Sequence, residues 1–525
     1  LADAGTTTGN ADVETYVLAA GTNAFTLGAD GQNVTLDSTG NSGNVTINTG
    51  SITTVTGTFD DNSGNDTIDL LINTNATTIS SANTTDVDAI QLASNVSATL
   101  TIAQNALINS ATGTNTVTLA DAGIATGNAN VENYILSSAG SNTFTLGATA
   151  QNVTGGSDAD TINMINGATG TLDLGAGANI INIADTVNIS AATIAALNGP
   201  YNLNFTDATS SITVSAAQLK GANDVTESSS GTKTVSLADA LTSYTVDADI
   251  DIINLADAVN DITLTGGSQQ VIGGSAADTI TSAGGGINLS TAAGTDTLNF
   301  TRDQLALATV DGGSESDTVV ITAASTAIVD ADFTNFTTVE VLKLTGASTA
   351  VLGTEAKQAG FSTIKTGDGN TDLTITDPGG GFPVTIDASA MDAADTLTIR
   401  GSGAITISGL VAQLTSYATG ALTISTDANA TQTIRFEASP TGTLTLGGAE
   451  SIVLANTVDL SALTLTGGGS YSLTLDPNAS VATTVAQHNT ATAITAAGSE
   501  TITFTDAGTA TGNADVEAYI LAAAG

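Results

Sequence analysis

Short runs in which apolar residues alternate with threonine or asparagine recur along the whole chain. A period of two with many β-branched residues predicts strands that bury one face. Gly, Asn, Asp and Ser separate these runs about every 8–12 residues, as turns require. The clearest predicted strands are 116–119, 171–174, 179–183, 186–189, 404–407, 441–446 and 463–466.

The small side chains favour one architecture over another. Phe, Tyr and Trp make up only 3% of the chain, so the core must consist of thin layers of Val, Ile, Leu and Ala. A parallel β-solenoid stacks small aliphatic residues in ladders, whereas a sandwich usually needs bulkier ones. We therefore predict an all-β, parallel solenoid-like fold, with a chain of small β-sandwich domains as the alternative. A few short helical connectors or caps are expected at 215–220, 302–307, 354–359 and 411–417.

Internal repeats organise the sequence. The phrase that begins at Leu1 returns 118 residues later at Leu119, more faintly at Leu237, and again at Phe504. Such a period predicts repeat units, and the gapless match of 144–162 to 262–280 predicts equivalent local structures. The expected organisation is repeat unit 1 (1–118), repeat unit 2 (119–236), a divergent unit 3 (237–330), a diverged β-rich region (331–503) and the start of a further copy (504–525).

The copy at 504–525 raises an expectation of its own. Terminal units of a repeat stack are normally altered as caps, and this one closely resembles the beginning of the chain. The sequence therefore predicts either a window of a longer repetitive polypeptide or ends that abut a neighbour in a polymer.

Charge excludes several functions. The chain has 51 acidic and 8 basic residues, a formal charge of −43, and no Lys or Arg before Lys220. Nucleic-acid binding is excluded because phosphate contacts need clustered bases, and binding to anionic membranes through a basic patch is disfavoured. Membrane insertion is not expected, because no apolar run reaches about 18 residues. The absence of Cys excludes disulfides, thiolate metal sites and a cysteine nucleophile.

The sequence also argues against catalysis. Its one histidine, His488, lies in a polar stretch without a nucleophile elbow, and we expect it to be solvated. An enzyme that cleaves polysaccharides on a β-helix would need carboxylates clustered with bases and aromatic platforms for sugars. With eight bases and no Trp, the chain is predicted not to be an enzyme.

Glycine-rich turns are the most plausible chemical sites. The pattern Gly-Gly-Ser-x-x-Asp-Thr-(Ile/Val) occurs three times, and 61–68 is related to it. Glycines allow a tight turn whose carbonyls face a hard cation, and the Asp adds a carboxylate. Plain Asp/Gly turns are the alternative, and in either case Ile162, Ile280 and Val319 should point inward. The candidate calcium ligands are Asp66, Gly155, Gly156, Asp158, Asp160, Gly273, Gly274, Asp278, Gly312, Gly313 and Asp317.

A second motif, Val-Glu-x-Tyr-(Ile/Val)-Leu, occurs at 13–18, 131–136 and 516–521. Alternation would put Glu, Tyr and Leu on one face and Val and Ile/Val on the other. The repeated Glu beside Tyr could mark an ion or a hydrogen bond between turns. A purely structural strand that enters the next unit is the favoured interpretation.

The glycine turns resemble the GGxGxDxUx nonapeptide of the repeats-in-toxin (RTX) family, whose members form calcium-bound parallel β-rolls. With the Val-Glu strands and phrases such as 384–390, the whole chain resembles bacterial RTX-type surface-layer proteins and giant repetitive adhesins. There are departures: the fourth-position glycine survives only at Gly64, and the copies are not in tandem. In the family adjacent turns share each ion, so an isolated copy offers half a site.

The resemblance implies a secreted, extracellular protein of the cell surface, exported without an N-terminal signal by type I secretion. Its function would be to assemble with copies of itself into a layer, sheath or filament, stabilised by divalent cations such as Ca²⁺. Cell-surface polysaccharide is a further implied partner. The stalk of a giant RTX-type adhesin is the alternative function.

Overall fold

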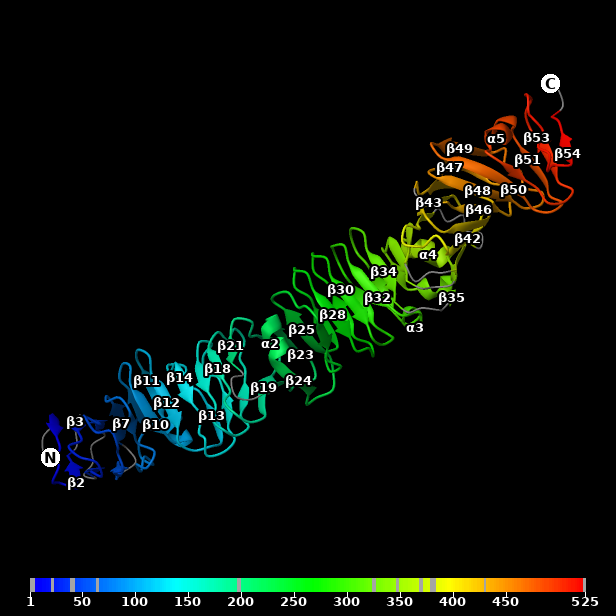
Figure 1. The fold of residues 1–525 in the computed structure, drawn as a ribbon. Coiled ribbons are helices and arrows are strands. Elements are labelled where there is room, and N and C mark those ends of the chain that lie inside the picture. The colour runs from blue at the N-terminus through cyan, green and yellow to red at the C-terminus, as the bar shows by residue number, and fades with distance from the viewer. Residues whose placement is uncertain are drawn as a thin grey trace. The chain divides into compact units, whose positions relative to one another are not determined.

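The computed structural model describes residues 5–19, 23–37, 43–62, 66–195, 200–322, 327–345, 349–367, 372–377, 384–428 and 431–522. Nearly all of their regular structure is β, in parallel strands stacked as a β-solenoid of about 23 turns (Figure 1). This confirms the predicted solenoid over the sandwich chain. The fold comprises two compact units, Leu1–Asp239 with Asp249–Ile252, and Ala240–Ala248 with Ile253–Gly525.

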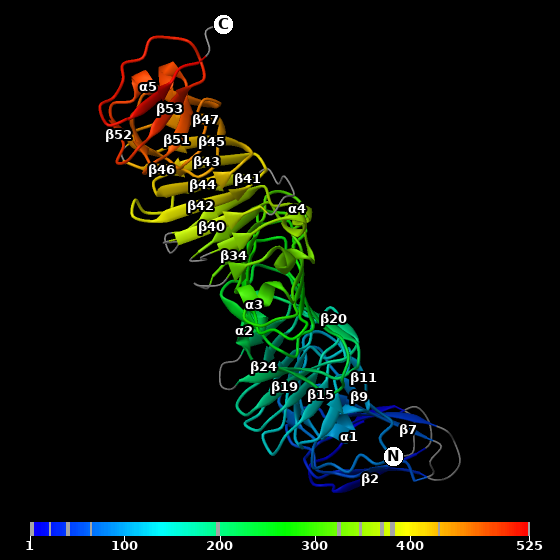
Figure 2. The same cartoon turned by 90° about the vertical axis from the view of Figure 1, so that its right-hand side faces the viewer.

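Consecutive strands belong to different faces, and each pairs with the equivalent strand of the next turn. In the first unit β15 (Thr143–Thr145) pairs with β17 (Thr161–Asn163), whereas β14 (Asn133–Ile135) pairs with β16 (Asn152–Thr154). All these pairs are parallel, and the stacking can be followed in Figure 2. Their sheets run β13 (Ile124–Thr126), β15, β17, β19 (Asn179–Ile183), β22 (Tyr201–Phe205), β24 (Ala222–Glu227); and β21 (Thr193–Ala195), β18 (Thr171–Asp173), β16, β14, β12 (Thr116–Leu119), β10 (Ser97–Leu100), β8 (Thr77–Thr78).

The second unit contains a twelve-stranded parallel sheet that positions most of the residues discussed below. Its strands, in order, are β26 (Tyr244–Val246), β28 (Asp261–Leu264), β30 (Thr279–Ser282), β32 (Thr297–Phe300), β34 (Thr318–Ile321), β37 (Val341–Leu344), β39 (Thr363–Thr366), β41 (Val384–Asp387), β43 (Ile405–Leu410), β45 (Ala421–Thr426), β47 (Thr441–Leu446) and β49 (Leu463–Gly467).

Aliphatic ladders fill the interior, as the low aromatic content predicts. Ile262, Ile280, Leu298, Val319 and Leu342 stand opposite one another in successive strands, and all are buried. Period two places every second side chain of a strand inside, where it meets the same position of the next turn. The expected inward orientation of Ile162, Ile280 and Val319 is therefore confirmed.

The gapless match between 144–162 and 262–280 is confirmed as a shared local structure. Phe144 pairs with Ile162 across β15 and β17, and Ile262 pairs with Ile280 across β28 and β30. The boundaries of the five predicted repeat segments remain predictions. In the last copy, β54 (Ala518–Ile520) matches β2 (Thr15–Leu18), but residues 509–511 do not form a strand like β1 (Thr6–Thr8).

Five short α-helices occur in the described part of the chain: α1 (Ile102–Asn105), α2 (Ala216–Gly221), α3 (Arg302–Leu305), α4 (Thr354–Ala359) and α5 (Val485–Thr490). The helical turns predicted at 215–220, 302–307 and 354–359 are confirmed. The one predicted at 411–417 is wrong, because β44 (Gln413–Ala418) buries alternate residues against the core. Among the described residues, none of these helices has the length and apolarity needed to span a membrane.

A buried glutamine links successive turns in a recurring way, which we call the glutamine clamp. At the start of α2, the Gln218 side-chain oxygen accepts the Ser215 N–H, while its amide donates to the carbonyls of Ile189 and Ala192, each at 2.7 Å. Gln151 makes the equivalent bonds without a helix. The clamp therefore satisfies the polar backbone of the preceding turn at its corner. Equivalent clamps are formed by Gln32, Gln104 and Gln487.

Candidate functional site: the glycine turns and the buried corner residues

The three full glycine turns lie at equivalent corners of the solenoid. Their glycines follow β16, β29 (Gln270–Ile272) and β33 (Thr309–Asp311), and their aspartates come directly before β17, β30 and β34. We call the residue directly before such a strand, or the strand's first residue in the case of Lys233, the corner residue. A Cβ on the first glycine would lie 2.2–2.4 Å from a carbonyl oxygen of the next turn, at Gly155, Gly273 and Gly312. Close approach of the next turn therefore requires glycine at these positions.

Asp160 accepts hydrogen bonds at both of its carboxylate oxygens. Its Oδ1 accepts the backbone and side-chain N–H of Asn142, at 2.9 and 2.8 Å, and its Oδ2 accepts the Gly156 N–H at 2.8 Å. Its own N–H donates to Asn179 Oδ1 at 2.9 Å. Asp160 is 1% exposed, so these bonds compensate for the water that the carboxylate loses.

The second unit stacks corner carboxylates in successive turns. The N–H of Asn260 donates to Asp278 Oδ1, that of Asp278 to Asp296 Oδ1, and that of Asp296 to Asp317 Oδ1, at 2.7–2.9 Å. The N–H of Asp317 donates to Glu340 Oε2 at 2.9 Å. We call Asp278, Asp296 and Asp317, each at most 1% exposed, the acidic column.

The acidic column differs from Asp160 in its second oxygen. The Oδ2 atoms of Asp278, Asp296 and Asp317 are buried and make no hydrogen bond of ordinary geometry. The Gly274 amide and the Thr291 hydroxyl lie near enough to Asp278 and Asp296, respectively, to favour their charged forms slightly. One oxygen of each carboxylate in the column therefore accepts a backbone N–H from a neighbouring turn, and the other oxygen accepts no hydrogen bond of ordinary geometry.

Burial dominates the ionisation of this column. It raises the pKa of Asp278 and of Asp296, and it raises the pKa of Asp317 to about 7. The N–H of Asp296 partly opposes the effect at Asp317, while the carboxylates of Asp296, Glu340 and Glu315 reinforce it. Parallel strands stand about 4.8 Å apart, so like charges at the same corner repel across each step. The arrangement favours a proton at the oxygens that accept no hydrogen bond.

The predicted calcium residues are thus brought together only in part. Asp278 and Asp317 enter one column, Asp160 and Asp66 lie at other corners, and Asp158 is exposed at the tip of its turn. Asp66 accepts the Gly43 N–H at 2.8 Å, and Gly64 lies outside the described residues. Calcium normally takes six to eight oxygen ligands, whereas Oδ1 of each column aspartate already accepts an N–H. Calcium at these turns remains a prediction.

Asp296 was missed because its turn, Ala292-Ala293-Gly294-Thr295, lacks the double glycine. The signal that would have found it is the triplet after the turn, Asp-Thr-apolar. Asp296-Thr297-Leu298 shares this triplet with the turns at Asp160, Asp278 and Asp317. Corner residues are therefore recognised by the strand residues that follow them rather than by the glycines before them.

A second acidic group joins two turns of the first unit. One carboxylate oxygen each from Asp60, Asp61 and Asp86 lies within 4.8 Å of the others. Partial burial and the neighbouring carboxylates raise the pKa of Asp86. Sequence reasoning missed this group because its members are separated by a whole turn. Its oxygens are ligands of the kind that Ca²⁺ accepts.

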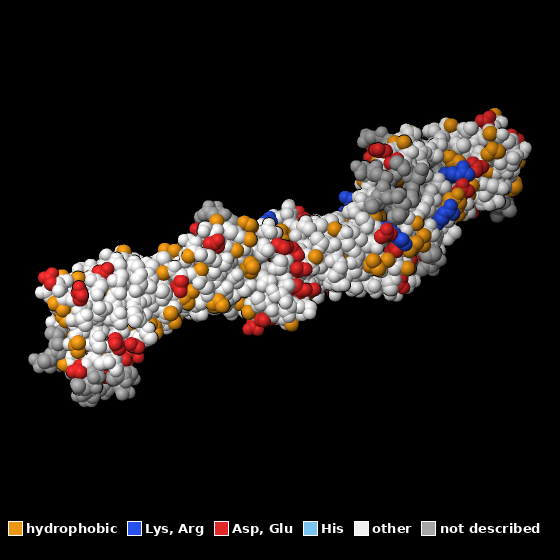
Figure 3. All heavy atoms as spheres, turned by 90° about the horizontal axis from the view of Figure 1, so that it is seen from below, with side chains coloured by type: hydrophobic (Ala, Val, Ile, Leu, Met, Phe, Trp, Pro, Cys, Tyr) orange, Lys and Arg blue, Asp and Glu red, His pale blue; other side chains and the backbone are white. Residues whose placement is uncertain are grey.

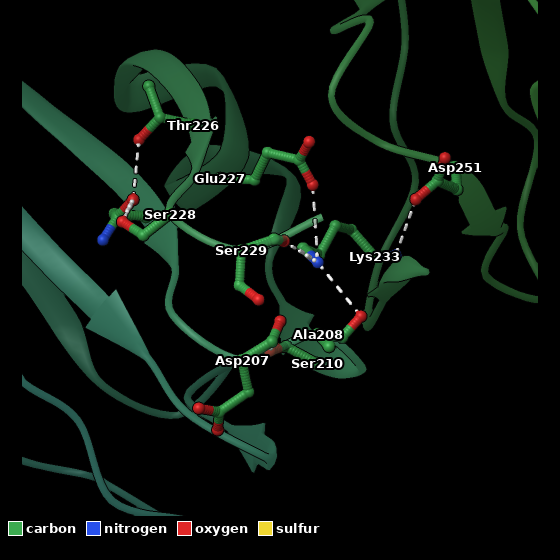
Figure 4. Close-up of polar contacts among 10 residues, drawn as sticks. Asp207, Ala208, Ser210, Thr226, Glu227, Ser228, Ser229, Lys233 and Asp251 are labelled. Carbon is green, nitrogen blue, oxygen red and sulfur yellow. Dashed lines mark hydrogen bonds and ion pairs between the residues drawn. The ribbon is translucent and has the colours of Figure 1, made fainter. Parts of the chain in front are cut away.

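Lys233 is a corner residue with a positive charge, where the corners described above have aspartate or glutamate (Figure 4). It begins β25 (Lys233–Leu237), in a Lys-Thr-Val triplet where other turns have Asp-Thr-apolar, and its N–H donates to Asp251 Oδ2 at 2.8 Å. Its side chain is 0% exposed. Nζ donates to the carbonyls of Ala208 at 3.1 Å and Ser229 at 2.6 Å, and lies 3.4 Å from Glu227 Oε2. Sequence reasoning did not single out this lysine.

The Val-Glu-x-Tyr motif supplies corner residues as well. Glu132 accepts the Asn115 N–H at 2.8 Å, and Glu517 accepts the Glu500 N–H at 2.9 Å. The Tyr134 hydroxyl accepts the Asn128 N–H at 2.7 Å. Of the two roles considered for this Glu, the structure shows the hydrogen bond between turns.

His488 is not solvated, contrary to the sequence prediction. It lies in α5, is 4% exposed, and its ring meets Phe504 and Tyr519 edge to face. Its Nε2 is 3.2 Å from the Tyr519 hydroxyl, and its Nδ1 is 3.3 Å from Asn489 Oδ1. The apolar neighbours come from later turns, which the local polar sequence does not reveal.

Comparison with protein-family models, with curated proteins and with solved structures found no match to this chain.

Proposed function

We propose that this chain is a structural protein of the cell surface, secreted, that associates with copies of itself into a layer, sheath or filament. The observation that carries the proposal is the stack of about 23 parallel turns, fastened corner to corner by acidic residues, glutamine clamps and Lys233. Each turn of such a stack contacts mainly its neighbours, so length and surface grow by repetition. The proposed role is structural rather than catalytic.

Divalent cations, calcium first, are part of the proposal. A charge of −43 opposes the approach of two copies, and it does so over a longer range at low ionic strength. Cations that bridge carboxylates reduce this repulsion. The partly buried group of Asp60, Asp61 and Asp86 provides clustered oxygen atoms for them.

The extracellular location draws on two features of the sequence. The chain has no cysteine, which suits an oxidising environment, and its glycine turns resemble those of RTX-type surface-layer proteins. Cell-surface polysaccharide is a proposed second partner, and the stalk of a giant adhesin is the competing assignment.

Electron microscopy and light scattering across a calcium series test this function. Ordered arrays or fibres that form as calcium rises, and disperse in chelator, would support assembly. Particles that stay monomeric at high concentration in millimolar calcium would overturn it and leave the adhesin stalk as the better assignment. Magnesium at equal concentration is the control for simple charge screening.

A further inference from the structure

The outer surface of the twelve-stranded sheet is unusually uniform. One column of the sheet, followed strand by strand from Asp261 in β28 to Thr464 in β49, contains threonine at nine of its eleven positions; the other two are Asp261 and Val341, which is buried. Those threonines are Thr279, Thr297, Thr318, Thr363, Thr385, Thr406, Thr423, Thr443 and Thr464. The parallel column two residues further along each strand includes Lys343, Lys365 and Asp387. We call the two columns together the threonine face.

The threonine face is neutral in a strongly acidic protein. Its charged members are Asp261, Asp387, Lys343 and Lys365, so its formal charge is zero, whereas the chain carries −43. Figure 3, which shows one side of the molecule, displays uncharged surface between small charged patches on that side. Copies of this chain therefore repel least when such a face takes part in the contact.

Lys343 and Lys365 give this face a positive centre. They are register partners on β37 and β39, and both are exposed; on its other side Lys365 has Asp387 of β41 as its register partner. Like charges directly opposite each other on adjacent strands destabilise a sheet. Among the described residues, no carboxylate oxygen lies within 4.0 Å of either ammonium group. An external carboxylate would relieve the repulsion between them.

We propose that the threonine face docks on a carboxylate-rich surface of a second copy of this chain, with Lys343 and Lys365 as its anchors. Charge complementarity selects this occupant, because the first 219 residues of each copy contain acidic residues and no lysine or arginine. Rows of threonine allow close approach without burying further charge. This inference rests on the proposed self-assembly and identifies the surface that performs it.

A charge-reversal pair with a matched control tests the anchors. Lys343→Glu/Lys365→Glu and Lys220→Glu/Lys357→Glu each make the formal charge of the chain four units more negative, at exposed lysines. Sedimentation at physiological salt, with and without calcium, measures self-association, and circular dichroism verifies the fold. We expect the first pair to raise the dissociation constant about tenfold or more, and the control pair to change it much less.

Each remaining outcome has a distinct meaning. Equal weakening by both pairs, or no weakening by either, would overturn the anchors while self-assembly stands. A wild-type chain that never associates would overturn the proposed function and this inference together. Alginate serves as an anionic polysaccharide probe. If it binds the wild type but not the Lys343→Glu/Lys365→Glu variant, and self-association of that variant is unchanged, the occupant of the face is a polysaccharide. That result would refute a second copy as the occupant. Lys343→Gln/Lys365→Gln serves if the reversed pair misfolds, and it should weaken association by a smaller factor.

Discussion

Replacing Lys233 by Met removes one ammonium group and keeps most of the aliphatic side chain. In the folded protein the carbonyls of Ala208 and Ser229 then lose their charged donor, and Glu227 loses its ion-pair partner. A hydrogen bond from a charged group contributes about 1.5–3 kcal/mol, and the pair with Glu227, whose side chain is 36% exposed, contributes about 0–1 kcal/mol. Met also avoids the cost of burying a charge, which offsets part of the lost bonding energy. We therefore expect the free energy of unfolding to fall by about 2–4 kcal/mol.

Denaturation in guanidinium chloride, followed by circular dichroism, measures this loss. A stack of turns unfolds in sections, so hydrogen exchange on peptides that cover 208–237 is needed to locate the effect. The first control is Glu227→Gln, which keeps Lys233 and its carbonyl bonds and should cost about 1 kcal/mol or less. The second is Lys220→Met at an exposed lysine, which should change stability by about 0.5 kcal/mol or less.

Two results would refute the reasoning. If Lys233→Met unfolds at the wild-type denaturant concentration with unchanged exchange at 208–237, the buried ammonium does not hold these turns together. If Glu227→Gln costs as much as Lys233→Met, the ion pair rather than the two carbonyl bonds carries the energy.

Three further predictions concern the other corners. Burial raises the pKa of Asp317 to about 7, so its contribution to stability is fully present below about pH 4 and is lost as the pH rises through 7. Asp317→Asn should therefore reduce the fall of the melting temperature between about pH 4 and pH 8, measured in chelator. A fall as steep as that of the wild type would contradict this. Gln151→Leu should lower the free energy of unfolding by about 2–3 kcal/mol because two carbonyls lose a donor, whereas Gln270→Leu, on the outer side of β29, should have little effect. If calcium occupies the turns near Asp160, Asp278 and Asp317, chelation should lower the melting temperature, by the equivalent of about 2.7 kcal/mol at a hundredfold excess of calcium over its dissociation constant, and identical melting curves would exclude such binding.

The fold was predictable because its determinants are local. Alternation in 116–119, 179–183 and 441–446 specifies strands with one buried face, and these are the strands observed. Short helical phrases were harder, because 411–417 has apolar residues that fit either period over so few positions. Contact with neighbouring turns decides in favour of β44 there.

The corner residues were only half predictable. The pattern of glycines and aspartates located the right turns, but what an aspartate does there depends on the turn before it. Asp160 and Asp278 each accept two N–H groups from an asparagine of the preceding turn, Asn142 and Asn260, but only Asp160 also accepts the Gly156 N–H at its second oxygen. Such differences depend on register between turns, which no single stretch of sequence contains.

The turn-to-turn hydrogen bonds also define how each unit would respond to tension. They run along the direction in which the turns are stacked, so a pull in that direction loads one turn's bonds at a time, as in opening a zipper. Thr116 pairs with Asn133 and Val310 with Phe336, so a detached turn frees 17 to 26 residues. At about 3.4 Å per extended residue, each rupture lengthens the chain by roughly 60–90 Å. Clamps and charged corners at intervals would make some of these ruptures harder than others, and the chain would absorb work in many small steps.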